Sequence, residues 1–174
     1  MALFMVFDVE SVGLHGEGYA VGYVVVDSEG NVYENARLAC DPKAATGDDE
    51  GRAWIAANCP PIPADFVDPK GVRASFWVSW RRWAEQGAVL VADCAWPVEA
   101  RFLAACVDDS PLDRTWLGPY PLHDVATARF LAGFDPLGLT ERLHGELPQH
   151  DPMCDARQSA RLWLEAHNKM GMTF

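Results

Sequence analysis

Two acidic residues follow the first apolar run of the chain. Asp8 and Glu10 end a segment, 3–7, that consists of apolar and aromatic side chains. If that segment is a strand, residues two apart point the same way, so both carboxylates project from one face. Two like charges on an apolar strand repel each other, and a hard cation such as Mg²⁺ or Mn²⁺ relieves that repulsion. The alternative is a strand that ends in a solvated turn, and taken alone this short pattern favours it.

A histidine and an aspartate near the end of the chain form the second group. His150 precedes Asp155 by five positions, and Pro152 lies between them. Because Pro152 keeps the residue before it extended, we expect Asp155 at or near the N-cap of a last helix. A loop histidine beside a metal cluster can take a proton from an attacking water molecule. The alternatives are a plain helix cap for Asp155 and an ordinary loop position for His150.

The third group surrounds a later apolar run. Asp93 follows the run 88–92, and Glu99 lies in the first turn of a helix expected at 97–107. Either acid is also explained as a cap or as a charge that complements the helix dipole. The carboxyl ends of sheet strands, however, are where α/β proteins place their sites, so these acids are expected near the first two groups.

The segments that must position these residues show strand and helix patterns in turn. Three strand-like runs predict a β-meander, and the later runs alternate as in βαβ units. They predict an α/β fold with a mixed five-stranded sheet and helices on its faces, in one domain over 1–174. The expected strands are 3–7, 19–26, 32–38, 88–92 and 120–125, and the expected helices are 50–57, 72–86, 97–107, 126–132 and 155–167.

Composition narrows the class of protein. Hydrophobic residues make up 49% of the chain, as in ordinary globular proteins, and no apolar run is long enough to span a bilayer. The N-terminal segment lacks the basic region of a signal peptide, and the five cysteines contain no C-x-x-C pair. These features predict a cytoplasmic protein with reduced thiols and no membrane partner. The net charge of −11 opposes contact with many phosphates of a nucleic acid but allows binding of only one end of the strand.

Three tryptophans recur at helical spacing within the expected helix 72–86. They are Trp77, Trp80 and Trp83, and arginines accompany them. Aromatic and basic side chains together can bind single-stranded nucleic acid. A stripe at this spacing is more often part of the core, and we adopt that interpretation, with Arg73, Arg81 and Arg82 on the solvent-facing side.

Taken in order, the three groups resemble the DEDDh family of 3′→5′ exonucleases, which includes the proofreading subunit of bacterial polymerases, ribonuclease T and oligoribonuclease. The Asp-x-Glu motif on the family's first strand matches Asp8 and Glu10. The His-x-x-x-x-Asp motif at the start of the family's last helix matches His150 and Asp155.

The family's second motif places an Asp three residues before an aromatic–aliphatic pair. Here Glu99 stands three residues before Phe102 and Leu103, so the spacing fits while the residue type departs from the pattern. Asp93 is the other candidate for the fourth acid.

The resemblance covers about 3–167 and implies a ribonuclease H-like fold and a 3′→5′ exonuclease that releases nucleoside 5′-monophosphates from RNA or DNA. The Pro-containing stretch 58–63 is similar to that of small exoribonuclease-like members, which favours RNA. Relatives are often homodimers. The resemblance also implies roles for single residues. Two divalent ions, Mg²⁺ or Mn²⁺, would be held by Asp8, Glu10, Asp155 and either Glu99 or Asp93. His150 would be the general base, and Ser11 and Val12 would lie near the 3′-terminal sugar.

Three other functions fit parts of the sequence. A catalytically inactive nucleic-acid-binding module of the same fold is allowed by the unusual second motif. A metal-dependent phosphatase or phosphodiesterase acting on small nucleotides would suit the acidic charge. An acidic mimic of nucleic acid is the third, although mimics spread their acids over a face rather than at strand ends.

Overall fold

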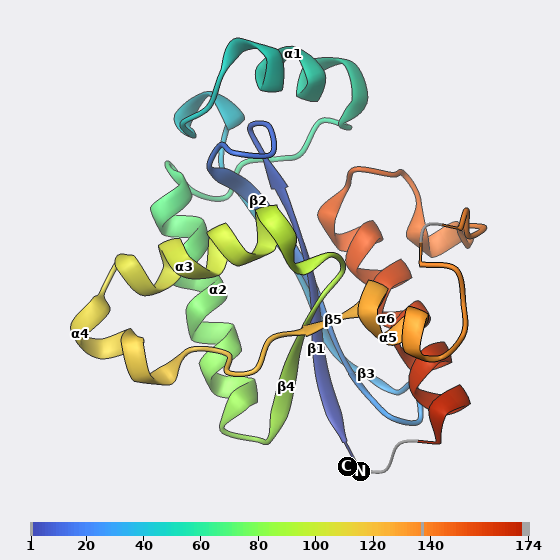
Figure 1. Cartoon of the computed structure of the whole chain (residues 1–174). Coiled ribbons are helices and arrows are strands. Elements are labelled where there is room, and N and C mark those ends of the chain that lie inside the picture. The colour runs from blue at the N-terminus through green and yellow to red at the C-terminus, as the bar shows by residue number, and fades with distance from the viewer. Residues whose placement is uncertain (1, 137, 172–174) are drawn as a thin grey trace.

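The computed structural model describes residues 2–136 and 138–171, and a five-stranded mixed sheet forms its centre (Figure 1). The strand order is β3-β2-β1-β4-β5, with β1 in the middle. β1 and β3 each pair antiparallel with β2, which forms the meander. β4 then pairs parallel with β1, and β5 pairs parallel with β4. The expected α/β fold class is therefore confirmed. The strands are β1 (Leu3–Ser11), β2 (Gly18–Asp27), β3 (Val32–Ala39), β4 (Ala88–Ala92) and β5 (His123–Asp124).

Helices cover both faces of the sheet. α2 and α3 pack on one face, and α5 and α6 pack on the other (Figure 1). The α-helices are α1 (Asp49–Asn58), α2 (Pro69–Ala84), α3 (Ala100–Asp108), α4 (Pro111–Arg114), α5 (Val125–Leu131) and α6 (Pro152–Met170). Shorter helical turns are η1 (Pro42–Ala44), η2 (Ala95–Glu99), η3 (Thr115–Leu117) and η4 (His144–Glu146).

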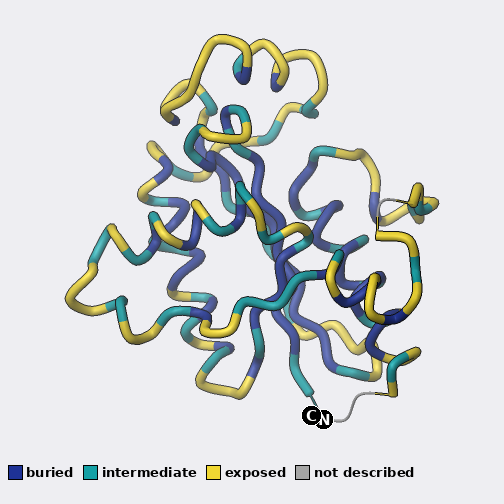
Figure 2. Tube along the Cα trace, viewed as in Figure 1, coloured by how far each residue is buried: buried dark blue, intermediate teal, exposed yellow. Residues whose placement is uncertain are grey.

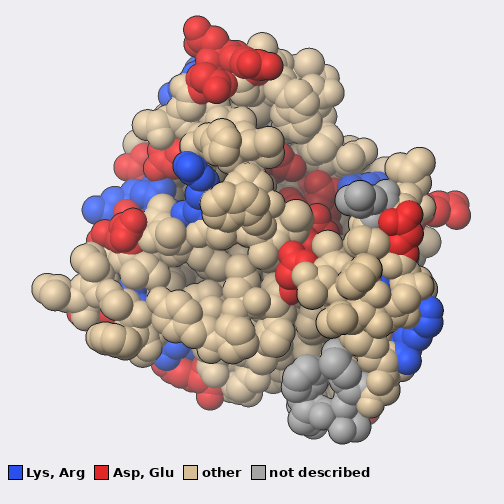
Figure 3. Space-filling view, viewed as in Figure 1, with Lys and Arg blue, Asp and Glu red and all other residues tan. Residues whose placement is uncertain are grey.

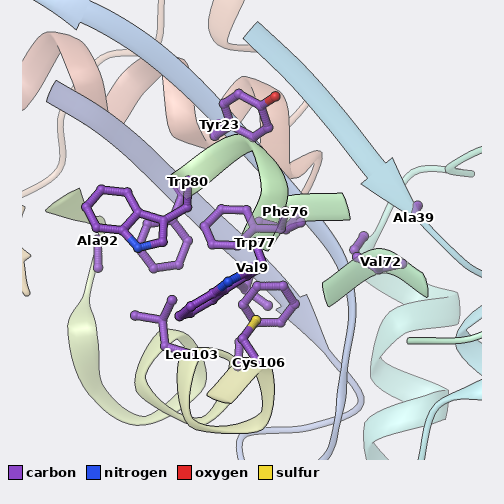
Figure 4. Packing of buried hydrophobic residues seen from close by; sticks show 14 of the residues in the cluster. Val9, Tyr23, Ala39, Val72, Phe76, Trp77, Trp80, Ala92, Leu103 and Cys106 are labelled. Carbon is purple, nitrogen blue, oxygen red and sulfur yellow. The ribbon is translucent and has the colours of Figure 1, made fainter. Parts of the chain in front are cut away.

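The larger apolar cluster lies between the sheet and the helices α2 and α3, and buried segments meet there (Figure 2). The three tryptophans of α2 belong to it, and Figure 4 shows Trp77 beside Val9 of β1 and Leu103 of α3, with Trp80 on the side of Ala92 of β4. The core interpretation of this stripe is confirmed. The expectation that Arg73 faces solvent is wrong, because its side chain is only 9% exposed.

Arg73 is buried because two acids neutralise it there. Its guanidinium donates to Asp109 Oδ2 at 2.7 Å and to Glu17 Oε1 at 2.6 Å. A buried charge is tolerated when it is paired and hydrogen-bonded in this way.

The central strand β1 has two different faces. Met5, Phe7 and Val9 belong to the cluster under α2 and α3, whereas Phe4 and Val6 belong to the smaller cluster under α5 and α6. Because side chains alternate, Asp8 and Glu10 continue the row of Phe4 and Val6 toward α6. The strand therefore changes from apolar to acidic at its carboxyl end.

Several expected boundaries are wrong: β1 runs on to Ser11 instead of ending at residue 7, α2 begins at Pro69 rather than at residue 72, and α3 begins at Ala100 rather than at residue 97. The last strand was expected over 120–125, but only His123 and Asp124 pair with β4. Pro121 has no N–H group for a sheet ladder, which explains why pairing begins after it. The last helix was expected from Asp155 and begins instead at Pro152.

No helix in the described part of the chain is long and apolar enough to cross a membrane.

Candidate metal centre

Four buried acids from three parts of the chain meet beyond the carboxyl end of β1. Asp8 and Glu10 come from β1, Glu99 ends the turn η2 after β4, and Asp155 lies in the first turns of α6. All four side chains belong to buried residues. Figure 3 shows acidic side chains gathered in a hollow between α3 and α6 on the viewed face.

The start of α6 is held close to the sheet. Asp151, not Asp155, is the N-cap: its carboxylate accepts from the N–H groups of Met153 at 3.0 Å and Cys154 at 3.4 Å. The expectation that Asp155 caps the helix is therefore wrong. Because Pro152 occupies the first helical position, where its missing N–H costs nothing, the helix begins three residues earlier than predicted.

A glycine of β2 permits this close approach. Gly22 pairs with Asp8 across the sheet, and a Cβ atom built on Gly22 would lie 2.2 Å from the backbone carbonyl carbon of Pro152. Any side chain at this position would push the first turn of α6 away from the sheet. Gly22 thus helps to bring Asp155 beside Asp8.

Burial makes ionisation of these acids costly. Asp8 Oδ2 is buried and has no hydrogen-bond partner among the described residues. Burial, reinforced by the charges of Asp155, Glu10 and Glu99, raises the pKa of Asp8 well above its ordinary value. Burial first, and then neighbouring acids, also raise the pKa of Glu10 and of Glu99 to about 8. A positive charge at this position would offset that cost.

His150 lies against Glu10 and adopts an unusual backbone conformation. Its φ of 63° is in the left-handed region, which is uncommon for residues other than glycine. This turn lets its N–H donate to Asp155 Oδ2 at 2.9 Å while its Nδ1 lies 3.8 Å from Glu10 Oε1. The imidazole also stands edge-on to Trp54, with ring centroids 4.8 Å apart. The loop therefore presents the ring to the acidic cluster.

Charge interactions and hydrogen bonds distinguish the two candidates for the fourth acid, Glu99 and Asp93. The charge of Glu99 acts on both Asp8 and Glu10. Asp93 acts on Asp8 as well, but one of its oxygens accepts from Ser159 Oγ at 2.7 Å. The turn that carries Glu99 is fixed by Asp124, whose carboxylate accepts from Ala95 N at 2.6 Å. Glu99 is thus the better placed of the two.

The donor set fits a hard divalent cation. Ligand atoms of Glu10, His150 and Asp155 all lie within 4.8 Å of one another. The unpartnered Asp8 oxygen adds a fourth donor on the same side of the sheet. The carboxylate oxygens are ligands that Mg²⁺ and Mn²⁺ accept, and the imidazole lies next to them.

A cleft of about 560 Å³ opens beside these acids, between the β1–β2 turn and α1. Ser11 lies on its wall. The Val12 side chain is only 1% exposed and packs under the turn against Gly47, so this side chain does not reach the cleft. The cleft is lined by Val9, Glu10, Ser11, Gly13, Leu14, Asp48, Glu50, Gly51, Trp54 and Val98.

Three residues near the centre escaped the sequence analysis. Arg142 donates to Asp155 Oδ1, Cys59 Sγ lies 3.9 Å from Glu10 Oε2, and Trp54 contacts His150. Trp54 lies within the predicted helix 50–57 and is 44% exposed, but its neighbours Ala53, Ile55 and Ala56 are apolar and do not mark it as a site residue. Arg142 and Cys59 lie in irregular segments whose patterns carry no signal.

Comparison of the sequence with known proteins gave no match to any family model, and no curated protein sequence is significantly similar. Comparison of the fold gave clear matches. Two are crystal structures of Exonuclease I from E. coli, one in complex with a dA16 oligonucleotide and one with a dT13 oligonucleotide.

Both superpose on this chain with a TM-score of 0.60 at 14% sequence identity. They cover 94% and 98% of this chain, which in turn spans 40% and 42% of theirs. The chain has the ribonuclease H-like fold found in that exonuclease. The part of Exonuclease I that matches is therefore less than half of its length, and the fold is what the two proteins share.

Proposed function

We propose that this chain is a metal-dependent 3′→5′ exonuclease that hydrolyses single-stranded or frayed nucleic acid, preferentially RNA, to nucleoside 5′-monophosphates. The observation that carries the proposal is the convergence of Asp8, Glu10, Glu99 and Asp155 around an unpartnered buried oxygen, with His150 at the rim. The fold shared with an oligonucleotide-bound exonuclease supports it.

The four acids would hold two Mg²⁺ or Mn²⁺ ions. When bound, such ions stabilise the attacking and leaving oxygens of an in-line phosphoryl displacement. Burial of all four carboxylates against apolar strands keeps bulk water away and favours cation binding over solvation.

His150 would act as the general base. Its ring is part-exposed, with Nδ1 3.8 Å from Glu10 Oε1, and stands edge-on to Trp54. The backbone N–H of His150 donates to Asp155 Oδ2 and so holds the loop that carries the ring. Glu10 faces the Nδ1 side of the imidazole, so the other nitrogen would accept a proton from an attacking water molecule. The proton later reaches solvent through the exposed edge of the ring.

The cleft beside the acids would receive the 3′-terminal nucleoside. Trp54 and Leu14 provide apolar walls against which a base could stack, and Ser11, on the same wall, would lie near the sugar. The segment 58–63 lies against α1 and β2 rather than in this cleft, so the preference for RNA rests on the family resemblance alone.

The test is a gel assay of 5′-labelled single-stranded RNA and DNA with Mn²⁺, with Mg²⁺ or with EDTA. We expect a metal-dependent ladder that shortens from the 3′ end, with RNA degraded faster. His150→Ala should lower turnover by about 10²–10⁴-fold, the usual contribution of a general base, and leave Mn²⁺ binding within about threefold of wild type.

Each alternative has its own outcome. Equal or faster degradation of DNA would remove the preference for RNA. Loss of Mn²⁺ binding together with activity in His150→Ala would make His150 a metal ligand rather than the base. Binding of both strands without any shortening would favour the inactive binding module.

A further inference from the structure

One arginine is built into the acidic centre. Arg142 Nη1 donates to Asp155 Oδ1, and the other Asp155 oxygen accepts from His150 N. Both oxygens of a proposed metal ligand are therefore already engaged by the protein. Within residues 2–136 and 138–171, no other Lys or Arg forms an ion pair with any of the four acids.

The position of Arg142 is fixed by its surroundings. Its Nη1 also donates to the backbone oxygen of Glu146 at 3.0 Å. Glu146 is anchored in turn, because its carboxylate accepts from Arg161 at 2.6 and 2.8 Å and from Leu143 N at 2.9 Å. The turn η4 is thus tied to the middle of α6, and Arg142 is held over the start of the same helix.

We propose that Arg142 is a resident counter-ion that a divalent cation must displace from Asp155. This inference rests on the proposed metal-dependent function. In the metal-free protein the guanidinium neutralises one of four crowded acids and keeps the Asp155 side chain directed into the site. A cation that coordinates the same oxygen competes for its lone pairs and is repelled by the guanidinium charge.

Arg142 therefore weakens cation binding and stabilises the metal-free protein. A metal ion that occupies Asp155 also frees the guanidinium, which remains beside the site on the bond to Glu146 and is then available to a substrate phosphate. Arg142 is a positioning residue by this argument, because it acts on the metal through Asp155.

The experiment measures Mn²⁺ binding by electron paramagnetic resonance and by titration calorimetry at one pH and one ionic strength. Arg142→Ala and Arg142→Gln should bind Mn²⁺ at least about fivefold more tightly than wild type, and their melting temperatures in EDTA should be lower. The rise in melting temperature on adding Mn²⁺ should accordingly be larger than in wild type. Arg142→Lys keeps the charge and should behave like wild type.

Arg37→Ala is the matched control. Arg37 pairs with Asp151 at 2.5 Å at the same helix end, so this variant loses the same charge without freeing a proposed ligand. Its Mn²⁺ affinity should stay within about twofold of wild type. If Arg37→Ala tightens binding equally, the effect is one of net charge and the counter-ion role is wrong.

The remaining outcomes separate the two proposals. Unchanged or weaker Mn²⁺ binding in both neutral Arg142 variants would overturn the counter-ion role while leaving the metal site intact. Absence of Mn²⁺ binding by wild type would overturn this inference together with the proposed metal-dependent function. Arg142→Gln, which can still donate to Glu146, keeps the test decisive if Arg142→Ala does not fold.

Discussion

At the scale of single residues, the acidic centre holds carboxyl groups in a buried environment where their ionisation is costly, and the rest of the protein does not offset that cost. Asp8 has a buried oxygen without a partner, and only Asp155 receives both an arginine and a backbone N–H. Burial raises the pKa of all these acids. The stability of the metal-free protein must therefore depend on whether they are protonated.

The first prediction at this scale concerns pH. The pKa of Glu10 and of Glu99 is about 8 in the folded protein, above the ordinary value of 4.5. Their protonated forms therefore stabilise the fold fully below pH 4.5, and that contribution declines as pH rises and is lost above pH 8. We expect the melting temperature in EDTA to fall by several degrees between about pH 5.5 and pH 8.5, since one pKa unit corresponds to about 1.4 kcal/mol.

Two comparisons check that ionisation of these glutamates causes the fall in melting temperature. Glu99→Gln, which stays neutral, should show a flatter decline, and Mn²⁺ should restore the lost stability of wild type at pH 8.5 because it binds the ionised acids. Acids with a lowered pKa, such as Glu146 and Glu34, stabilise the fold when ionised. Their contribution is lost only as pH falls below this range, so they do not affect the comparison. A melting temperature that is constant or rises between the two pH values would contradict the prediction.

At the scale of elements, two close approaches determine the site. The turn η2 is held through Asp124, and the first turn of α6 lies against Gly22 of β2. A Cβ atom at Gly22 would be 2.2 Å from Pro152 C and 2.3 Å from Met153 N, and both are backbone atoms that cannot rotate away. The helix would have to move as a unit, and Asp155 with it.

Gly22→Ala tests this packing. We expect a loss of about 1–3 kcal/mol, as for other overpacked sites, and a decrease of about 2–12 °C in melting temperature. Mn²⁺ binding should weaken as well, because Asp155 is displaced relative to Asp8. Gly145→Ala is the control: no atom lies within 4 Å of its added Cβ, so stability and Mn²⁺ affinity should be unchanged. Normal Mn²⁺ affinity in Gly22→Ala would show that α6 needs no such contact.

The bounds of an element were predicted best where its apolar residues form a clear pattern in the sequence. The expected bounds of β4 match the structure residue for residue, since 88–92 is a short apolar run that follows the left-handed Gly87. The start of α6 was missed although the Asp151-Pro152 pair has the residue types of a cap and first helical position.

The site residues were predictable only where a short motif lies on a regular element. Asp8 and Glu10 followed from strand alternation, and the prediction that His150 and Asp155 lie beside them agrees with their positions. Arg142 was not predictable, because it reaches Asp155 from a segment without periodicity and across 13 positions. Its contact depends on the η4 turn and the Glu146–Arg161 pair, which are tertiary features.

At the scale of the whole molecule, the distribution of charge limits how nucleic acid can bind. The chain has 14 basic residues and a net charge of −11. Seven arginines are already paired with acids: Arg37, Arg73, Arg81, Arg82, Arg129, Arg142 and Arg161. Among the described residues, none that lines the cleft is basic, while Glu10, Asp48 and Glu50 are acidic. Under the proposed function, affinity would then come from the terminal nucleoside and from bound cations.

The last prediction follows from this distribution. If one or two phosphates are contacted, the logarithm of kcat/KM should fall with the logarithm of KCl concentration with a slope no steeper than about −1.4, whereas a footprint of six phosphates would give about −4. For the same reason, kcat/KM for a dinucleotide should be within about tenfold of that for a strand of about 20 nucleotides. The measurement is a kinetic series over KCl and strand length at constant Mn²⁺. A steep slope with a strong preference for long strands would require a basic track elsewhere on the surface, because the cleft beside Glu10 cannot supply one.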